Sequence, residues 1–202
     1  MKQQPAIAVM ELNSIPRGIF TGDAMVKNSP VSILRSGTVH NGKYLILVGG
    51  SVASVEEAYR TGLTAGEGFV TDSLFLPDPH MSVVNALSGK RETCSGQSIA
   101  TIETLTVPAA VKAADAGIKG AEVRILEIRM ADDLGGKGLI IFTGKLEEVE
   151  TAVKISVDVL SEKETLLDTS IIPRPEEETG GQLNRSSSFR ESDPRSLEGG
   201  EV

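Results

Sequence analysis

The sequence holds a single cysteine, no tryptophan, 3% aromatic residues and no apolar run long enough to cross a membrane. The lone Cys94 excludes a disulfide within the chain and fits a reducing compartment. Without a long apolar run or a signal-peptide pattern, the chain is expected to be soluble and cytoplasmic. A net charge of −8 argues against nucleic acid and against a membrane surface as partners.

What the sequence does contain is a repeat. Residues 7–35 align with residues 99–127 at ten identical positions, where chance gives roughly two. After two small shifts the repeat continues to residues 79 and 175. Each unit has the length of a small domain and is too long for a solenoid repeat. The matching residues in the first unit are Ile7, Ala8, Glu11, Pro16, Asp23, Ala24, Lys27, Val31, Ile33 and Leu34.

Both units show the same order of predicted elements. The first is expected to form strand 6–12, helix 15–28, strands 31–39 and 44–48, helix 51–65 and strand 69–76. The second repeats this order as strand 99–105, helix 107–119, strands 123–131 and 138–143, helix 146–160 and strand 165–172. The order β-α-β-β-α-β is the ferredoxin-like split βαβ arrangement, so we predict an α/β (α+β) fold with two tandem domains.

The composition divides the chain into four parts. Residues 5–80 and 98–178 are expected to be the two domains, and residues 81–97 a linker. From residue 179 the sequence is rich in Gly, Ser, Arg, Glu and Pro. Such a composition buries too little apolar surface to fold, so we predict a disordered tail over 179–202.

Several motifs together resemble one known family. They are Asp23–Lys27 with its copy Asp115–Lys119, the Gly-Lys turn before a strand, the following Val-x-x-Val-Glu-x-Ala helix, and Ile172–Pro175. In this order, and in both halves, they resemble the shell proteins of bacterial microcompartments. The likeness covers residues 6–177 and is to the tandem class with two shell domains per chain, in particular to that of propanediol-utilisation compartments. The first strand begins each unit, which indicates the unpermuted form.

The resemblance implies an assembly. Three chains would form a homotrimeric ring of six shell domains, a flat tile within the compartment in the cytoplasm. Tiles would meet other shell proteins, both hexameric tiles and pentameric vertices, and also the encapsulated enzymes. Lys27, Lys119 and Arg174 would then lie at tile edges. The alternative for the lysines is an exposed helix end without a functional role.

The resemblance also places two loops at a central pore. The loop of the first unit comprises Val39, His40, Asn41 and Gly42, and that of the second Asp132, Asp133, Leu134 and Gly135. Glycines let the backbone turn tightly near the axis. The aspartates would add negative charge that favours cations or neutral solutes over anions, unless they face bulk solvent.

His40 takes the position where the propanediol-utilisation relative carries a cysteine that ligates an iron–sulfur cluster. Because thiolates are the usual ligands of such clusters, the histidine departs from the pattern. Three His40 side chains on the axis would instead suit a divalent metal such as Zn²⁺, or a gate whose charge depends on pH. The alternative is an unliganded histidine at the pore rim. A redox or metal-carrying tile is therefore the second functional hypothesis.

A third hypothesis is a small enzyme or ligand sensor on the same scaffold. The sequence contains no Ser-His-Asp set, no paired cysteines and no cluster with metal-ligand spacing. Glu11 and Glu103 occupy matching strand positions, where paired carboxylates can serve acid–base chemistry. Because the repeat itself accounts for the match, a structural role is the better interpretation, and the chain is predicted not to be an enzyme.

Overall fold

The computed structural model describes residues 6–94 and 97–191, which form two copies of one domain. The first contains β1 (Ala6–Leu12), α1 (Ile15–Asn28), β2 (Ile33–Val39), β3 (Lys43–Gly50), α2 (Val52–Ala65) and β4 (Val70–Leu76). The second contains β5 (Ser98–Thr104), α4 (Val107–Gly120), β6 (Arg124–Met130), β7 (Gly138–Gly144), α5 (Leu146–Leu160) and β8 (Leu166–Ile172). The predicted order of elements is confirmed in both units.

Each domain has one four-stranded antiparallel sheet. The strand orders are β2-β3-β1-β4 and β6-β7-β5-β8, so the first strand of each unit is central. This is the unpermuted split βαβ topology that the sequence predicts. The registers also match, since Glu11 lies opposite Leu45 and Asp72, and Glu103 opposite Leu139 and Asp168. Residues aligned by the repeat therefore occupy equivalent places in the two sheets.

The helices that follow the central strands begin in the same way. Ser14 caps α1 by accepting from the backbone N–H of Arg17, and Thr106 caps α4 by accepting from that of Ala109. A proline in the first turn follows each cap, where its missing N–H costs no hydrogen bond. The local sequence thus fixes where both helices start.

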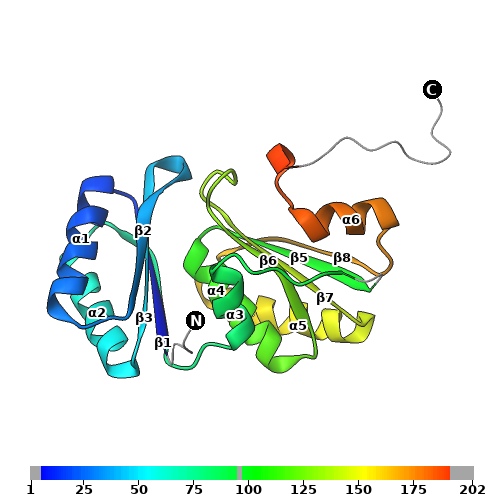
Figure 1. The fold of residues 1–202 in the computed structure, drawn as a ribbon, viewed down its shortest axis with the longest axis horizontal. Coiled ribbons are helices and arrows are strands. Elements are labelled where there is room, and N and C mark those ends of the chain that lie inside the picture. Colours follow the sequence, from blue (N-terminus) through cyan, green and yellow to red (C-terminus); the bar gives the residue numbers. More distant parts are fainter. Residues whose placement is uncertain (1–5, 95–96, 192–202) are drawn as a thin grey trace.

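The first sheet is covered on both faces. Ala8, Met10 and Leu12 of β1 pack with the core under α1 and α2. Ile7 and Val9, which point to the opposite face, belong to the core of the second domain. In Figure 1 the sheet stands between its own helices and helix α4 of the second domain. Strand β1 is therefore buried along its whole length.

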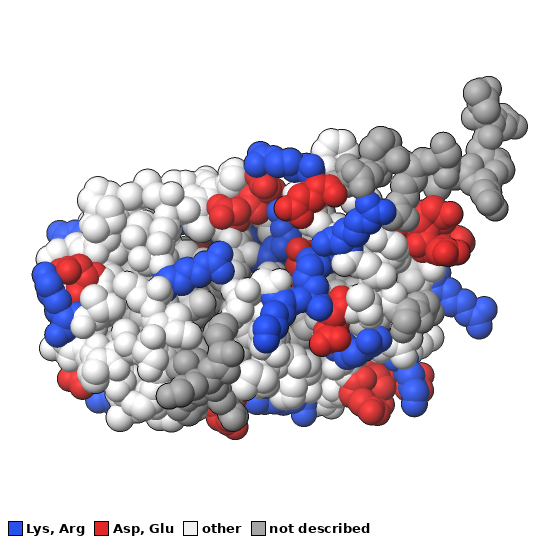
Figure 2. All heavy atoms as spheres, viewed as in Figure 1, with Lys and Arg blue, Asp and Glu red and all other residues white. Residues whose placement is uncertain are grey.

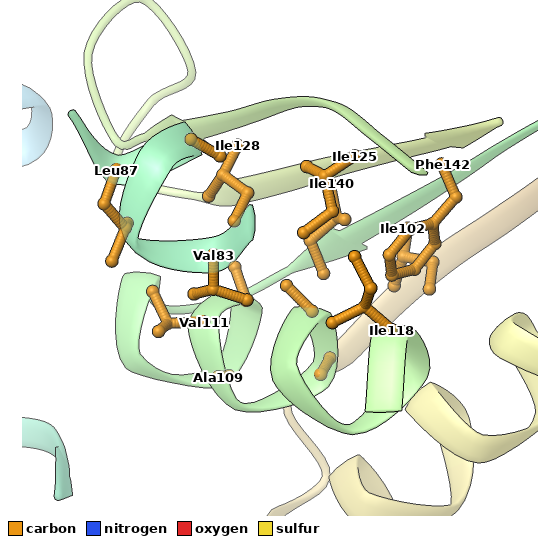
Figure 3. Packing of buried hydrophobic residues seen from close by; sticks show 14 of the residues in the cluster. Val83, Leu87, Ile102, Ala109, Val111, Ile118, Ile125, Ile128, Ile140 and Phe142 are labelled. Carbon is orange, nitrogen blue, oxygen red and sulfur yellow. The ribbon is translucent and has the colours of Figure 1, made fainter. Parts of the chain in front are cut away.

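The second domain holds the larger core. Its sheet contributes Ile102, Ile140 and Phe142, which lie over α4 (Figure 3). The buried side of α4 is built from small residues, including Ala109, Ala110, Ala113 and Ala114, so helix and sheet approach closely. With few aromatic residues available, packing of aliphatic and alanine side chains supplies most of the buried apolar surface.

The segment predicted as a linker contains helix α3 (Met81–Leu87). His80 caps this helix by accepting from the backbone N–H of Ser82 at Nδ1. Val83 and Leu87 are buried in the shared core, close to Val111 (Figure 3). Residues 81–87 are therefore part of the packed structure that joins the domains, and residues 95 and 96 lie outside the described part.

The prediction of disorder from residue 179 is wrong for its first residues. Residues Glu177–Arg185 form helix α6, which lies on the sheet face opposite α4 and α5 (Figure 1). Leu183 packs on a small cluster with Cys94 and Ile99, and the Asn184 side chain hydrogen-bonds both backbone groups of Cys94. These contacts compensate for a polar composition. Residues 192–202 of the predicted tail lie outside the described residues.

The sole cysteine allows a test of this docking. Leu183→Ala should weaken the packing of α6 on the sheet by about 1.5 kcal/mol. A thiol reagent should then label Cys94 roughly tenfold faster. The physical reason is that Cys94 is buried beneath α6. Leu63→Ala, at an exposed leucine of α2, is the matched control and should leave the rate unchanged. Equal labelling of the Leu183 variant and the parent chain would contradict the docking.

Candidate pore loops and domain interface

The two loops predicted at a pore are both tight turns. Between β2 and β3, Asn41 and Gly42 have φ of 66° and 68°. Between β6 and β7, Asp133 and Gly135 have φ of 59° and 62°. These left-handed conformations favour glycine, asparagine and aspartate, which explains the residue types at the turns. The expectation that glycines let both loops turn sharply is confirmed.

The structure brings the two loops together. The backbone N–H of Asp133 donates to Nδ1 of His40 at 3.0 Å, and Lys43 Nζ donates to the Gly136 carbonyl at 3.1 Å. The loops lie side by side between the domains in Figure 1. Although 93 residues apart in sequence, His40 and Asp133 form one surface feature. We refer to residues 39–42 and 131–136 as the paired loops.

The paired loops carry charges of both signs. His40 lies 3.5 Å from an Asp132 carboxylate oxygen and 3.9 Å from one of Asp133. Arg190, from the segment after α6, lies 3.6 Å from Asp133, and Arg129 donates to the Asp132 carbonyl at 3.0 Å. The aspartates therefore lie beside two arginines, so the charges at the paired loops are of both signs.

A cavity of about 400 Å³ opens beside the paired loops. Its lining comes from β2, β3, β6, the second loop and the segment after α6. The polar residues among them include Arg35, Glu127, Arg129, Asp132 and Glu191. The cavity thus adjoins both domains and is lined by the same mixture of charges as the loops.

The donors near His40 do not fit an iron–sulfur cluster. Cys94 is the only thiol, and it is buried beneath α6, where its Sγ donates to the Gln97 carbonyl. Nδ1 of His40 already accepts a hydrogen bond, which leaves one imidazole nitrogen and carboxylates rather than thiolates. Within the described residues, no three His, Cys, Asp or Glu side chains gather as a metal site.

The predicted edge residues occupy different environments. Lys27 is exposed on α1 and pairs with Asp23 at 2.6 Å. Lys119, its counterpart on α4, pairs with Asp115 and also donates to the Asp78 carbonyl, in the segment between β4 and α3. Lys119 therefore ties the two domains together within the chain. Arg174 is exposed just after β8.

Two buried carboxylates join the domains, and sequence reasoning assigned no such contact. Glu11 is fully buried; it pairs with Lys43 at 2.5 Å and accepts from the Val107 backbone N–H at 2.9 Å. Asp72 accepts from the Thr106 hydroxyl at 2.5 Å. Glu11 thus binds the first N–H of α4, which has no partner within the helix, and Asp72 binds the side chain of the capping residue Thr106. The sequence does show that Glu11 and Lys43 recur as Glu103 and Lys137. In the structure this second pair is also in contact, at 3.0 Å.

Charged side chains are unevenly distributed over the face shown in Figure 2. In Figure 2 the first domain shows few charged side chains on this face, whereas positive and negative side chains intermingle over the second domain. Within the part of the chain that the structure describes, no helix combines the length and apolar character needed to span a bilayer. A mixed surface suits contacts with other proteins rather than with a polyanion.

The chain is a tandem repeat of split βαβ domains, in which the sheet of the first domain packs against helix α4 of the second. The family model of the BMC domain matches residues 6–79 and again residues 98–175. The chain therefore belongs to the family of bacterial microcompartment shell proteins, as a structural shell protein with two tandem BMC domains.

Three relatives give the family match its detail. The bacterial microcompartment shell protein PduT of Citrobacter freundii is 37% identical over 178 residues, which cover 88% of this chain and 97% of PduT. The carboxysome assembly protein CcmO of Synechocystis sp. is 27% identical over 84% of this chain and 61% of its own length. A crystal structure of a microcompartment protein from Desulfitobacterium hafniense superimposes with a TM-score of 0.76 at 35% identity, covering 85% of this chain and 95% of that one.

Proposed function

We propose that three copies of this chain form a ring of six BMC domains, a homotrimeric tile with a central pore. The contact between the paired loops supports the proposal best, because it lies where two consecutive domains meet. Threefold symmetry would repeat this contact around one axis. The domains of the ring would be residues 5–80 and 98–178, joined through residues 81–97.

The pore would be lined by both loops of every chain. Val39, His40, Asn41 and Gly42 would alternate around the axis with Asp132, Asp133, Leu134 and Gly135. The mixture of imidazole, carboxylate and nearby guanidinium groups suits the passage of small polar metabolites rather than one sign of ion. We propose a structural and transport role and no catalytic one, because the relatives are shell proteins.

The tile would share its edges with other shell proteins. Lys27 and Arg174 are exposed and suit contacts between tiles, including hexameric tiles, pentameric vertices and the enclosed enzymes. Lys119 is partly engaged within the chain, so its contribution to an edge would be smaller than that of Lys27. The two halves of the repeat would then present unequal edges.

Native mass spectrometry and electron microscopy test the proposal together. The parent chain should appear as trimers and should form sheets at high concentration. Lys27→Ala should keep the trimer and reduce sheet formation, with a change in unfolding free energy within about 0.5 kcal/mol, because its ion pair is exposed. A parent chain found only as monomers would contradict the tile. Undiminished sheets from the lysine variant would contradict the edge role alone.

A further inference from the structure

The outer face of α1 lacks the cover that its counterpart has. Val107 and Val111 of α4 are fully buried, because the first sheet packs against them. The repeat aligns them with Ile15 and Ile19 of α1, which are 36% and 56% exposed. One apolar helix face is therefore covered within the chain, and its copy faces solvent.

The second sheet lacks the matching cover. Every residue of β1 is buried, including Val9 and Glu11 on the face toward α4. In β5, the two positions that are only partly buried are Thr101 and Glu103, which the repeat aligns with Val9 and Glu11. The surface that receives a helix in the first domain is thus open in the second. The exposed helix face therefore belongs to the first domain, and the uncovered sheet face belongs to the second domain of the same chain.

The contact within the chain shows what fits the open sheet. Glu11 and Asp72 are neighbours in the first sheet and accept from the Val107 N–H and the Thr106 hydroxyl at the start of α4. Each is also paired with a lysine. The two carboxylates therefore cap a helix that comes from a different domain.

The second sheet carries the same carboxylates without a helix to cap. Glu103 and Asp168 are neighbours in register, as Glu11 and Asp72 are. Glu103 pairs with Lys137 at 3.0 Å and its side chain is 35% exposed, against 0% for Glu11. Asp168 is exposed and accepts from the Thr169 N–H at 2.8 Å, as Asp72 does from Ser73. The acceptor site is preformed.

Helix α6 leaves room for a helix at this site. Leu87 of α3 aligns with Leu183 of α6, and the two lie at equivalent places, Leu87 with Ile7 in the larger core and Leu183 with Ile99 in the smaller cluster. On the first sheet, α4 packs against β1 and β4, and Leu87 of α3 lines a hollow together with Ile7 and Leu47 beside it. On the second sheet, α6 takes the place of α3, and the place of α4 stays open.

We infer that Glu103 and Asp168 form an intermolecular helix cap, which receives the start of α1 from a second copy of this chain. Glu103 would accept from the Ile15 N–H of that copy and Asp168 from its Ser14 hydroxyl. This inference rests on the proposed ring and names the residues that close it. The contact is heterologous, so repetition generates a closed ring when the rotation permits.

The same relation extends to the paired loops. Lys43 bridges Glu11 and the Gly136 carbonyl within the chain. The repeat aligns Lys43 with Lys137 and Gly136 with Gly42, so Lys137 would bridge Glu103 and the Gly42 carbonyl of the next copy. Each lysine then joins a helix cap to a loop at the axis. Loss of the cap would thereby also release the loops.

Two variants that are each defective at one end test the inference. The first, called the tail variant, carries Glu103→Lys with Asp168→Lys and is defective in the sheet that receives the helix. The second, called the head variant, carries Ile19→Asp and is defective in the helix α1 that is received. All three positions are exposed or partly exposed, so both chains should fold, as their circular dichroism and melting temperatures would show. Each carboxylate should contribute tenfold to a hundredfold to affinity, so the tail variant alone should be monomeric where the parent is trimeric.

The mixture of the two variants gives the decisive measurement. The second sheet of the head variant is intact, and so is helix α1 of the tail variant. These two surfaces can form one interface, and no other intact pair is available. Native mass spectrometry should therefore show a one-to-one dimer that does not grow to a trimer. A tail variant that stays trimeric would overturn the helix cap and leave the ring proposal intact. A monomeric parent chain would instead overturn the ring itself.

Discussion

Replacing Glu11 with glutamine is expected to lower the free energy of unfolding by about 3 kcal/mol, at the lower end of the range for breaking a buried ion pair. Glu11 is fully buried, and its carboxylate joins Lys43 to the Val107 N–H. The neutral amide keeps one acceptor oxygen for the two donors, so either Lys43 or the Val107 N–H loses its partner, and Lys43 loses its counter-charge in either case. The lysine is mostly buried, so water replaces the lost charge poorly.

The same substitution should also uncouple the domains. Both tyrosines, Tyr44 and Tyr59, lie in the first domain, and the chain has no tryptophan. Tyrosine fluorescence therefore reports on the first domain, whereas circular dichroism reports on both. In urea, the two signals should coincide for the parent and separate for Glu11→Gln, because the substitution weakens a contact across the domain boundary.

The repeat supplies a matched control for this prediction. Glu103→Gln changes the equivalent residue in the second sheet, where the side chain is partly exposed. In the Ile19→Asp background, where contacts between copies are removed under the proposal, it should cost only about 0–1 kcal/mol. Equal losses for the two substitutions in that background would show that burial at the domain boundary does not determine the cost.

Most of the fold follows from local sequence signals. All eight strands and the four helices of the repeated units are predicted, because caps, first-turn prolines and turn glycines coincide with the ends of apolar segments. Helices α3 and α6 are not, since α3 is short and α6 is polar. Their stability comes from contacts with distant parts of the chain, such as those of Leu183 and Asn184.

The candidate site is predicted only in part. The sequence identifies His40 and Asp133 as loop residues, and the resemblance assigns both loops to one axis. It does not predict that the Asp133 N–H binds His40, because that contact depends on how two domains are oriented. The same limit applies to Glu11 and Glu103. Their equivalence is visible in the sequence, but only the packing of α4 makes one buried and the other open.

The contact between the first helix and the third strand of each repeated unit is packed differently in the two domains. In the first domain Tyr44 covers Gly18, where an added Cβ would lie 2.3 Å from the ring carbon Cγ and 2.4 Å from Cβ of the tyrosine. In the second, the aligned residues are Gly138 and Ala110, so the larger group is on the helix. The larger side chain at this contact therefore lies on the strand in the first domain and on the helix in the second.

Gly18→Ala is accordingly expected to destabilise the chain by about 1–3 kcal/mol, because the clash involves the base of the Tyr44 side chain, which cannot swing aside. Gly22→Ala, on the same helix, places its Cβ 3.7 Å from Ile46 and should stabilise by up to about 1 kcal/mol through helix propensity. In a Tyr44→Gly background, Gly18→Ala recreates the pair found in the second domain and should be neutral or stabilising. Urea unfolding followed by circular dichroism measures the parent, the three single variants and the double variant. A Gly18→Ala cost that is the same with and without Tyr44 would assign the strain to another contact, since interacting neighbours must show coupling in such a cycle.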